Sequence, residues 1–191
     1  MHLLLLDEVM PEPWRNGGGV TRPLVSAREA GMVSAGPAIA DWRLSLADIS
    51  ADAEFSVFAG MQRHAVLLGS GAVSLVSNGA EPVWVRPLQP VSFPGEPRWH
   101  ARRKPGSLEL RFLNLMVRRS VLRGELQVIE CQRQVHAGTA WALLPLAGRW
   151  QLSGDVIVGV GQLAWDEGNG GCLMQPLEAD ASAVLALVHS I

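Results

Sequence analysis

Apolar and polar residues alternate with a period of two along most of this chain, which is the pattern of β-strands with one buried face. In the segment "WRLSLADI", the apolar residues Trp42, Leu44 and Leu46 share one face of the predicted strand. Arg43 and Ser45 share the opposite face. These two polar residues therefore either meet solvent or, if the strand lines the mouth of a barrel, face a ligand.

A second strongly alternating segment, "SLELRFLNLMVRR", carries one polar residue in an otherwise apolar row. The residues that share this face are Leu110, Phe112, Asn114 and Met116. A buried amide without hydrogen-bond partners costs about 1–3 kcal/mol of stability. We therefore expect the side chain of Asn114 to be buried and hydrogen-bonded.

Turn residues separate the other strand-like segments at close spacing. The segment "HAVLLGSGAVSLVSNG" predicts a strand, a glycine turn, a second strand and a hairpin turn at Asn78-Gly79. Many short strands with few helical signals predict an all-β sandwich or barrel. The segment "LLGSGAVSLVSNG" is similar in texture to "LLPLAGRWQLSGD" in the second half, which suggests two similar β-barrels.

Composition and charge restrict the class of protein. The chain has 191 residues, of which 48% are hydrophobic and 18% charged, so it can bury a core without a disulfide or a metal. Its net charge of −2 gives no reason to expect nucleic acid or an acidic membrane as a partner. No apolar run approaches the roughly 20 residues of a membrane-spanning helix. We expect a soluble, cytoplasmic protein of bacterial origin.

Candidates for catalytic chemistry are few. The five histidines stand singly, with no His-x-His pair, and the two cysteines, Cys131 and Cys172, form no metal-binding pair. The glycines of "NGGGVT" are not followed by the Lys-Ser/Thr of a phosphate-binding loop, and no Gly-x-Ser-x-Gly elbow is present. We therefore predict no metal, no cofactor and no catalytic residue.

The segment "PWRNGGGVTR" resembles the Pro-Trp-Lys/Arg-Asn-Gly-Gly-Gly-x-Thr signature of the HutD/Ves family. Further family motifs follow in order, namely "WRLSLADISADAEFSVFAGMQRHAVLLGSG", "PVSFPGE" and "LNLMVRR". The motifs run from Trp14 to Arg119, somewhat over half of the chain. Three positions depart from the family pattern. Pro23 stands where an acidic residue often follows the signature, Glu96 replaces an aspartate, and Phe112 replaces an acid.

This resemblance implies a bicupin, in which one chain forms two cupin-like β-barrels without the metal ligands of a cupin. We expect the N-terminal barrel in residues 1–120 and a smaller C-terminal barrel in residues 121–191, with the first strand free to cross over between the barrels. Members of the family are encoded with bacterial histidine-utilisation enzymes or respond to cold and stress. The resemblance therefore implies a binding protein that modulates histidine utilisation, rather than an enzyme.

The ligand that the family implies is a small carboxylate, such as urocanate, formiminoglutamate or formylglutamate. Because an arginine fork holds a carboxylate through two charge-assisted hydrogen bonds, we expect Arg63 to bind it with support from Arg43. Ser45 and Asn114 would orient the polar remainder of the ligand, and Trp14 would form a wall of the pocket. Matched positions of the family motifs predict this ligand-binding set: Trp14, Asn16, Gly17, Gly18, Thr21, Arg43, Ser45, Arg63, Asn114 and Met116.

The three glycines at 17–19 admit two interpretations. Glycine permits positive φ and close backbone approach, so the loop can fold over a pocket mouth and offer its N–H groups to a carboxylate. The alternative is a tight turn that packs the N-terminal strand against the barrel. Replacing Gly18 with alanine distinguishes the two: a change in ligand affinity at unchanged melting temperature favours the first interpretation, and lost stability alone favours the second.

Two other functions stay open. A metal-independent isomerase or hydrolase acting on a small acid of the same pathway is the first alternative, and a protein-interaction module is the second. A homodimer formed through a sheet edge is also compatible with the sequence, because exposed strand edges have to be covered or protected.

Overall fold

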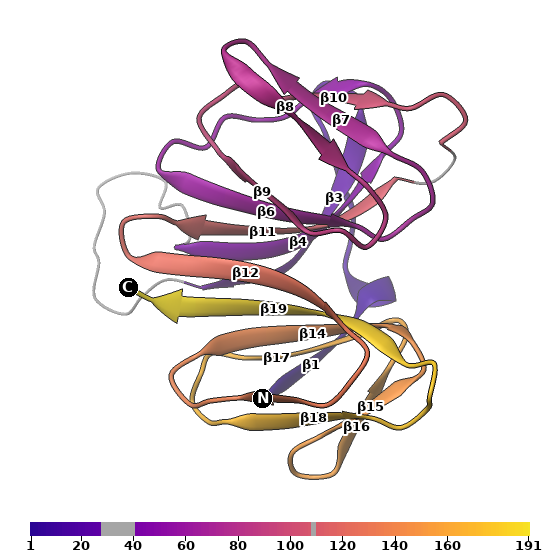
Figure 1. Ribbon diagram of the computed structural model, residues 1–191, viewed down its shortest axis with the longest axis vertical. Coiled ribbons are helices and arrows are strands. Elements are labelled where there is room, and N and C mark those ends of the chain that lie inside the picture. The colour runs from indigo at the N-terminus through magenta and orange to yellow at the C-terminus, as the bar shows by residue number, and fades with distance from the viewer. Residues whose placement is uncertain (28–40, 108–109) are drawn as a thin grey trace. The chain divides into compact units, whose positions relative to one another are not determined.

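The computed structural model describes residues 1–27, 41–107 and 110–191. These residues form 19 strands, one short 3-10 helix, η1 (Leu6–Glu8), and no α-helix, which confirms the predicted all-β fold. No helix in the described ranges is long and apolar enough to cross a membrane. The described chain divides into two compact units, one of Pro11–Arg123 and one that combines Met1–Met10 with Gly124–Ser190 (Figure 1).

The unit of residues 11–123, which we call the N-terminal barrel, contains two antiparallel sheets. The six-stranded sheet has the strand order β2 (Glu12–Pro13), β3 (Gly19–Ala27), β4 (Trp42–Ile49), β11 (Arg111–Arg118), β6 (Met61–Leu67) and β9 (Val91–Pro94). The four-stranded sheet has the order β5 (Ala53–Glu54), β10 (His100–Arg103), β7 (Val73–Ser77) and β8 (Ala80–Val85).

One apolar core joins the two sheets of the N-terminal barrel. Leu67 and Phe112 come from the six-stranded sheet and Leu75 and Ala101 from the four-stranded sheet, and all four belong to one buried cluster. Because side chains of a strand alternate between its two faces, this cluster takes every second residue of each strand that contributes to it. Polar residues on the same strand faces as these core residues therefore also point into the barrel.

The hairpin predicted at Asn78-Gly79 is confirmed. Strands β7 and β8 pair antiparallel on either side of it, with Ser77 opposite Ala80. Gly79 has a φ of 76°, a backbone conformation that residues with a Cβ atom rarely adopt. The glycine therefore sets this two-residue turn, as the sequence pattern indicates.

The second unit, which we call the C-terminal barrel, repeats this construction. Its five-stranded sheet has the order β1 (His2–Leu5), β17 (Gln162–Asp166), β14 (Ala140–Ala147), β19 (Ser182–Ser190) and β12 (Leu122–Ile129). Its four-stranded sheet has the order β13 (Arg133–Val135), β18 (Cys172–Pro176), β15 (Arg149–Leu152) and β16 (Val156–Gly159). The first strand of the chain thus pairs with β17, far along the sequence, in register from His2 opposite Trp165.

Candidate ligand-binding site

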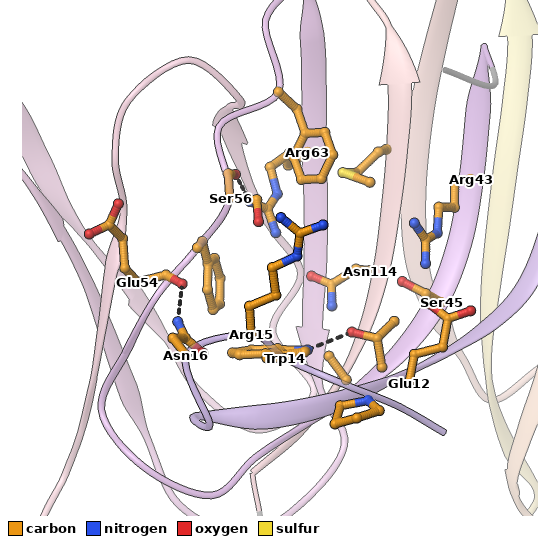
Figure 2. A pocket seen from close by; sticks show the side chains of 16 residues that line it. Glu12, Trp14, Arg15, Asn16, Arg43, Ser45, Glu54, Ser56, Arg63 and Asn114 are labelled. Atoms are coloured by element: carbon orange, nitrogen blue, oxygen red, sulfur yellow. Dashed lines mark hydrogen bonds between the residues drawn. The ribbon is translucent and has the colours of Figure 1, made fainter. Parts of the chain in front are cut away.

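A cavity of about 520 Å³ lies in the N-terminal barrel (Figure 2). This volume falls within the usual range for sites that bind small molecules. Three arginines, two glutamates and several aromatic rings contribute to its surface. The residues that line it are Glu12, Pro13, Trp14, Arg15, Asn16, Thr21, Arg43, Ser45, Ala47, Glu54, Phe55, Ser56, Phe58, Arg63, Asn114 and Met116.

Strands β4, β11 and β6 bring the polar residues of this cavity together. Residues directly opposite each other on antiparallel strands point their side chains to the same face of the sheet. On β11, Met116 stands opposite both Arg43 of β4 and Arg63 of β6. Two residues earlier, Asn114 stands opposite Ser45 of β4. Three strands that are far apart in sequence therefore present one continuous polar patch.

The same rows become apolar at the next register position. There Phe112 stands opposite Ala47 of β4 and Leu67 of β6, and all three belong to the core. The barrel interior is thus polar at one end and closed by packed apolar side chains toward the other. Of the two interpretations of Arg43 and Ser45, the structure supports the one in which they face a cavity, because both residues line it.

Arg63 is the most deeply buried charged group of the cavity. Its side chain is only 7% exposed, and its guanidinium carbon lies 4.8 Å from the ring centre of Phe55, 5.6 Å from Phe58 and 5.2 Å from Phe93. One nitrogen, Nη1, donates a 3.4 Å hydrogen bond to the carbonyl of Ser56, and Nε has no partner. Among the described residues no carboxylate pairs with it. Burial lowers the pKa of Arg63 from its ordinary value to about 10, so the side chain stays charged at neutral pH.

Asn114 differs in part from its expected environment. The side chain is buried, with 7% of its surface exposed, as the apolar row predicts. The expected hydrogen bonding is wrong for one atom, because Oδ1 is buried and has no partner. Its register neighbours are Ser45 of β4 and Ala65 of β6, and neither donates a hydrogen bond to this oxygen. An amide left in this state is a group that a ligand can satisfy.

Two further arginines and two glutamates lie around the buried side chains of Arg63 and Asn114. In Figure 2 the side chains of Arg15 and Arg43 point into the cavity around Asn114, and Glu12 lies near its rim. Glu54 also lines the cavity, but its carboxylate pairs with Arg98 at 3.4 Å. The cavity therefore carries more positive than negative charge.

The loop that contains Trp14 closes one side of the cavity. The indole Nε1 donates a 2.8 Å hydrogen bond to Oγ1 of Thr21, and the ring meets Phe55 edge to face at 5.8 Å between ring centres. Asn16 fixes the loop from the other end, because its Nδ2 donates a 3.0 Å hydrogen bond to the carbonyl of Glu54 (Figure 2). Trp14 and Asn16 thus form a wall that is tied to two separate strands.

Gly17 and Gly18 do not line the cavity. The N–H of Gly17 donates to the carbonyl of Trp14 at 3.0 Å, and the N–H of Gly18 donates to Oδ1 of Asn16 at 3.1 Å. Gly17 needs its freedom for a φ of 71°, and a Cβ on Gly18 would stand 2.3 Å from Cβ of Ala53. Because both N–H groups are used within the loop, these contacts favour the tight-turn interpretation of the glycines.

Eight of the ten residues expected to bind ligand line the cavity together. The eight are Trp14, Asn16, Thr21, Arg43, Ser45, Arg63, Asn114 and Met116. Sequence reasoning did not place Phe55 and Ser56 in the site, although both stand in the motif "EFSVF", nor Arg15, which stands in "PWRNGGG". Glu54 and Phe58 stand at the two ends of "EFSVF", and for Glu12 no motif gives a signal.

The three residues that depart from the family pattern, Phe112, Glu96 and Pro23, lie in different parts of the N-terminal barrel. Phe112 is buried in the apolar core and lies outside the cavity lining. Glu96 accepts a 2.8 Å hydrogen bond from the N–H of Gly60 and pairs with Arg119, so it stabilises the turn before β6. Pro23 lies in β3 next to an irregularity in the pairing with β4. The described residues contain no group of three or more His, Cys, Asp or Glu side chains that could hold a metal.

Solved structures define the class of protein. An oxalate decarboxylase from Lactobacillus farciminis matches with a TM-score of 0.65 at 10% identity, over 99% of this chain and 86% of that chain, which shows likeness of fold alone. A protein from Escherichia coli matches with a TM-score of 0.71 at 9% identity, over 97% of this chain and 89% of that one. The chain is a cupin-like protein with two β-barrels, as the sequence predicts.

The family follows from closer matches. The family model HutD matches residues 7–184, and this chain belongs to the HutD family. Protein Ves from Cronobacter sakazakii is 30% identical over 156 residues, which is 82% of each chain. The structure of HutD from Pseudomonas fluorescens matches with a TM-score of 0.81 at 25% identity, over 100% of this chain and 98% of that chain. The resemblance carried by the sequence motifs is confirmed.

Proposed function

We propose that the N-terminal barrel binds a small carboxylate, and that the protein modulates bacterial histidine utilisation in the cytoplasm through this binding, without catalysing a reaction. Arg63 carries this proposal. Its guanidinium lies in the cavity, is buried, and pairs with no carboxylate of the described residues. A buried charge without a counter-charge is costly, and an anionic ligand removes that cost.

The rest of the cavity fits the same ligand class. Nη1 and Nη2 of an arginine form a planar fork that matches the two oxygens of a carboxylate. Ser45 and the unpartnered Oδ1 of Asn114 supply polar groups beside that fork. Trp14 and Phe55 supply apolar walls for the carbon skeleton. The link to histidine utilisation rests on membership of the HutD family.

Calorimetric titration with urocanate, formiminoglutamate and formylglutamate tests the proposal. We expect at least one of these acids to bind the wild-type protein. We expect Arg63→Met, which keeps an unbranched side chain of similar length, to weaken that binding by at least 100-fold, because a buried charge-assisted pair is lost. Arg86→Gln is the matched control, since Arg86 is exposed, belongs to the same barrel and does not line the cavity.

Two results would contradict the proposal. Absence of binding by all three acids would exclude the ligand class that the family implies. Unchanged binding by Arg63→Met would exclude the role given to this arginine. Turnover assays on the same acids, with and without a chelator, distinguish binding from the alternative of a metal-independent enzyme.

A further inference from the structure

We propose that strand β8, the turn after it and the exposed side of β10 form a docking surface for an acidic segment of another protein. We call this the Trp84 surface, and its exposed side chains are those of Trp84, Arg86, Leu88, His100, Arg102 and Lys104. None of these residues lines the cavity. The proposal goes beyond ligand binding, because a protein that modulates a pathway without catalysis has to contact another macromolecule.

Two large apolar side chains are exposed within five residues of each other on this surface. Trp84, in β8, is 59% exposed, and Leu88, in the turn that follows, is 41% exposed. Within the described part of residues 11–123, Val57 is the one other exposed side chain of this kind. Tryptophan is enriched among the residues that dominate binding between proteins, because its rigid ring buries a large area at little cost in entropy.

The backbone at Leu88 is held in an unfavourable conformation. Its φ is 56°, in the left-handed region, where glycine is the usual residue and a bulky side chain is rare. Two hydrogen bonds hold it there. The N–H of Leu88 donates to the carbonyl of Leu67 at 2.9 Å, and the N–H of Gln89 donates to the carbonyl of Arg86 at 3.2 Å. A strained residue that exposes an apolar side chain is expected where that side chain meets a partner.

Positively charged side chains lie beside these apolar residues. The register places Trp84 of β8 opposite Ser74 of β7, and Ser74 opposite Arg102 of β10, so the three lie in one row on the same face of the sheet (Figure 1). The backbones of Trp84 and Arg102 are therefore two strand spacings apart, roughly 10 Å. His100 stands two residues before Arg102, on the same face of β10.

The cations of the Trp84 surface have no counter-charge in the described chain. The ion pairs of the described residues include none with Arg86, Arg102 or Lys104. The segment "RWHARRK" at 98–104 contains four Arg and Lys residues and no acid. Among these four, Arg98 is the one that pairs with a carboxylate, that of Glu54. A partner that supplies carboxylates therefore complements this surface.

The distribution of charge favours a protein segment over nucleic acid. Residues 11–123 contain 14 Lys and Arg residues and 9 Asp and Glu residues, a net charge of +5. Residues 1–10 and 124–190 contain 2 and 9, a net charge of −7. Binding of nucleic acid depends on charge summed over many phosphates, so a net-negative chain disfavours it. A short acidic segment needs only the local positive charge.

Fluorescence anisotropy with synthetic peptides of about 12 residues tests the proposal on the full-length protein. The first peptide combines glutamates with two leucines. A second peptide replaces the leucines by serine, and a third replaces the glutamates by glutamine. We expect the first to bind at least fivefold more tightly than either of the others, because the surface offers both charge and apolar area. Equal binding of the first two peptides, or binding of none, would overturn the proposal.

Variants distinguish a docking role from a role in stability. We expect Trp84→Ser and Leu88→Gly each to weaken binding of the first peptide at least fivefold. Leu88→Gly should leave the melting temperature unchanged or higher, because glycine adopts a φ of 56° without strain. Ile157→Ser is the matched control, since Ile157 is an exposed apolar residue of the C-terminal barrel. Unchanged peptide binding in both Trp84→Ser and Leu88→Gly would contradict the proposal.

Other occupants of the surface are outcomes of the same experiments. Light scattering that shows a dimer in the wild type and a monomer in Trp84→Ser would assign the surface to a second copy of this chain. Tighter binding of a single-stranded oligonucleotide than of the first peptide would assign it to nucleic acid. Either result would overturn the proposal. Trp84→Ser should bind small carboxylates as the wild type does, so failure here leaves the proposed function intact.

Discussion

The two barrels of this protein are built alike and filled differently. Each combines two antiparallel sheets around an apolar cluster. In the C-terminal barrel, Trp141, Trp150 and Met174 are fully buried within that cluster. Of the seven buried polar or charged residues of the described chain, six belong to the N-terminal barrel, and Asp166 is the only one that belongs to the C-terminal barrel.

This difference is the one expected if the N-terminal barrel binds a ligand, as proposed above. Burying a polar group without partners lowers stability, and a core made of apolar side chains avoids that loss. In the C-terminal barrel, the indole Nε1 atoms of Trp141 and Trp150 are buried without a partner, and both groups are neutral. The N-terminal barrel departs from the rule at a charged group, Arg63, and at the amide of Asn114, and both residues line the cavity. Such departures are expected where a protein meets a ligand.

Creating a packing cavity in the C-terminal barrel should have the largest effect on stability. We expect Trp150→Ala to lower the free energy of unfolding by about 3–5 kcal/mol, because a fully buried tryptophan leaves a cavity. Trp84→Ala is the control, since Trp84 is 59% exposed and should cost well under 1 kcal/mol. Urea denaturation followed by circular dichroism measures both. Similar losses in the two variants would contradict the description of the C-terminal barrel as tightly packed.

The wall loop of the N-terminal barrel should be the next most sensitive region. We expect Gly18→Ala to destabilise the protein by about 1–3 kcal/mol, since the new Cβ would stand 2.3 Å from Cβ of Ala53. Gly170→Ala is the matched control, because nothing lies within 4 Å of the Cβ position there and its φ is not in the left-handed region. Thermal unfolding compares them. A stable Gly18→Ala variant with altered ligand affinity would instead favour a loop that contacts ligand.

Replacing Arg63 with an apolar residue should remove the buried charge that distinguishes the N-terminal barrel from the C-terminal one, and so raise stability. Burial lowers the pKa of Arg63 to about 10, so the unfolded chain holds this proton more strongly. The resulting cost of charge burial is on the order of 3 kcal/mol below pH 10 and decreases as the pH rises further. Loss of the contacts with aromatic rings offsets about 1–2 kcal/mol. We expect Arg63→Met to raise the ligand-free melting temperature by a few degrees.

Calorimetry without added anions, at neutral pH, gives that melting temperature. Arg86→Gln again serves as the control and should leave it unchanged, because Arg86 is exposed. A fall of several degrees in Arg63→Met would mean that the guanidinium stabilises the empty barrel. The cavity would then be a structural feature rather than a site held at a cost in stability.

The period-two pattern predicted the faces of the strands well. It placed Phe112, Asn114 and Met116 on one face, and the register confirms that they form one row facing the interior. The same pattern could not decide what Arg43 and Ser45 face. Trp42, Leu44 and Leu46 on the opposite face of β4 are buried as well. A strand with one apolar and one polar face is normally expected to expose the polar face, so no sign in the sequence indicated that both faces of β4 are covered.

The composition of the cavity was only partly predictable. Motif positions led to Arg63 and Asn114. Glu54 is held by pairing with His100, far along the chain, and Glu12 by pairing with Thr21 in the neighbouring strand β3. The sequence could not predict that Oδ1 of Asn114 has no hydrogen-bond partner, because this depends on which side chains the neighbouring strands supply. The local pattern determines which face of the sheet a side chain lies on, and the pairing of strands determines which side chains it contacts.

The tethered wall of the cavity has a consequence for the speed and thermodynamics of binding. Trp14 and Asn16 are already held by Thr21 and the carbonyl of Glu54, and two N–H groups, of Ser50 and Ala51, bond the carbonyl of Gly18. A ligand of the proposed class would therefore meet a surface that does not have to be ordered on arrival, which preserves conformational entropy that a loose loop would lose. Association should then proceed in a single kinetic phase whose rate rises in proportion to ligand concentration, without the plateau that a slow closing step imposes.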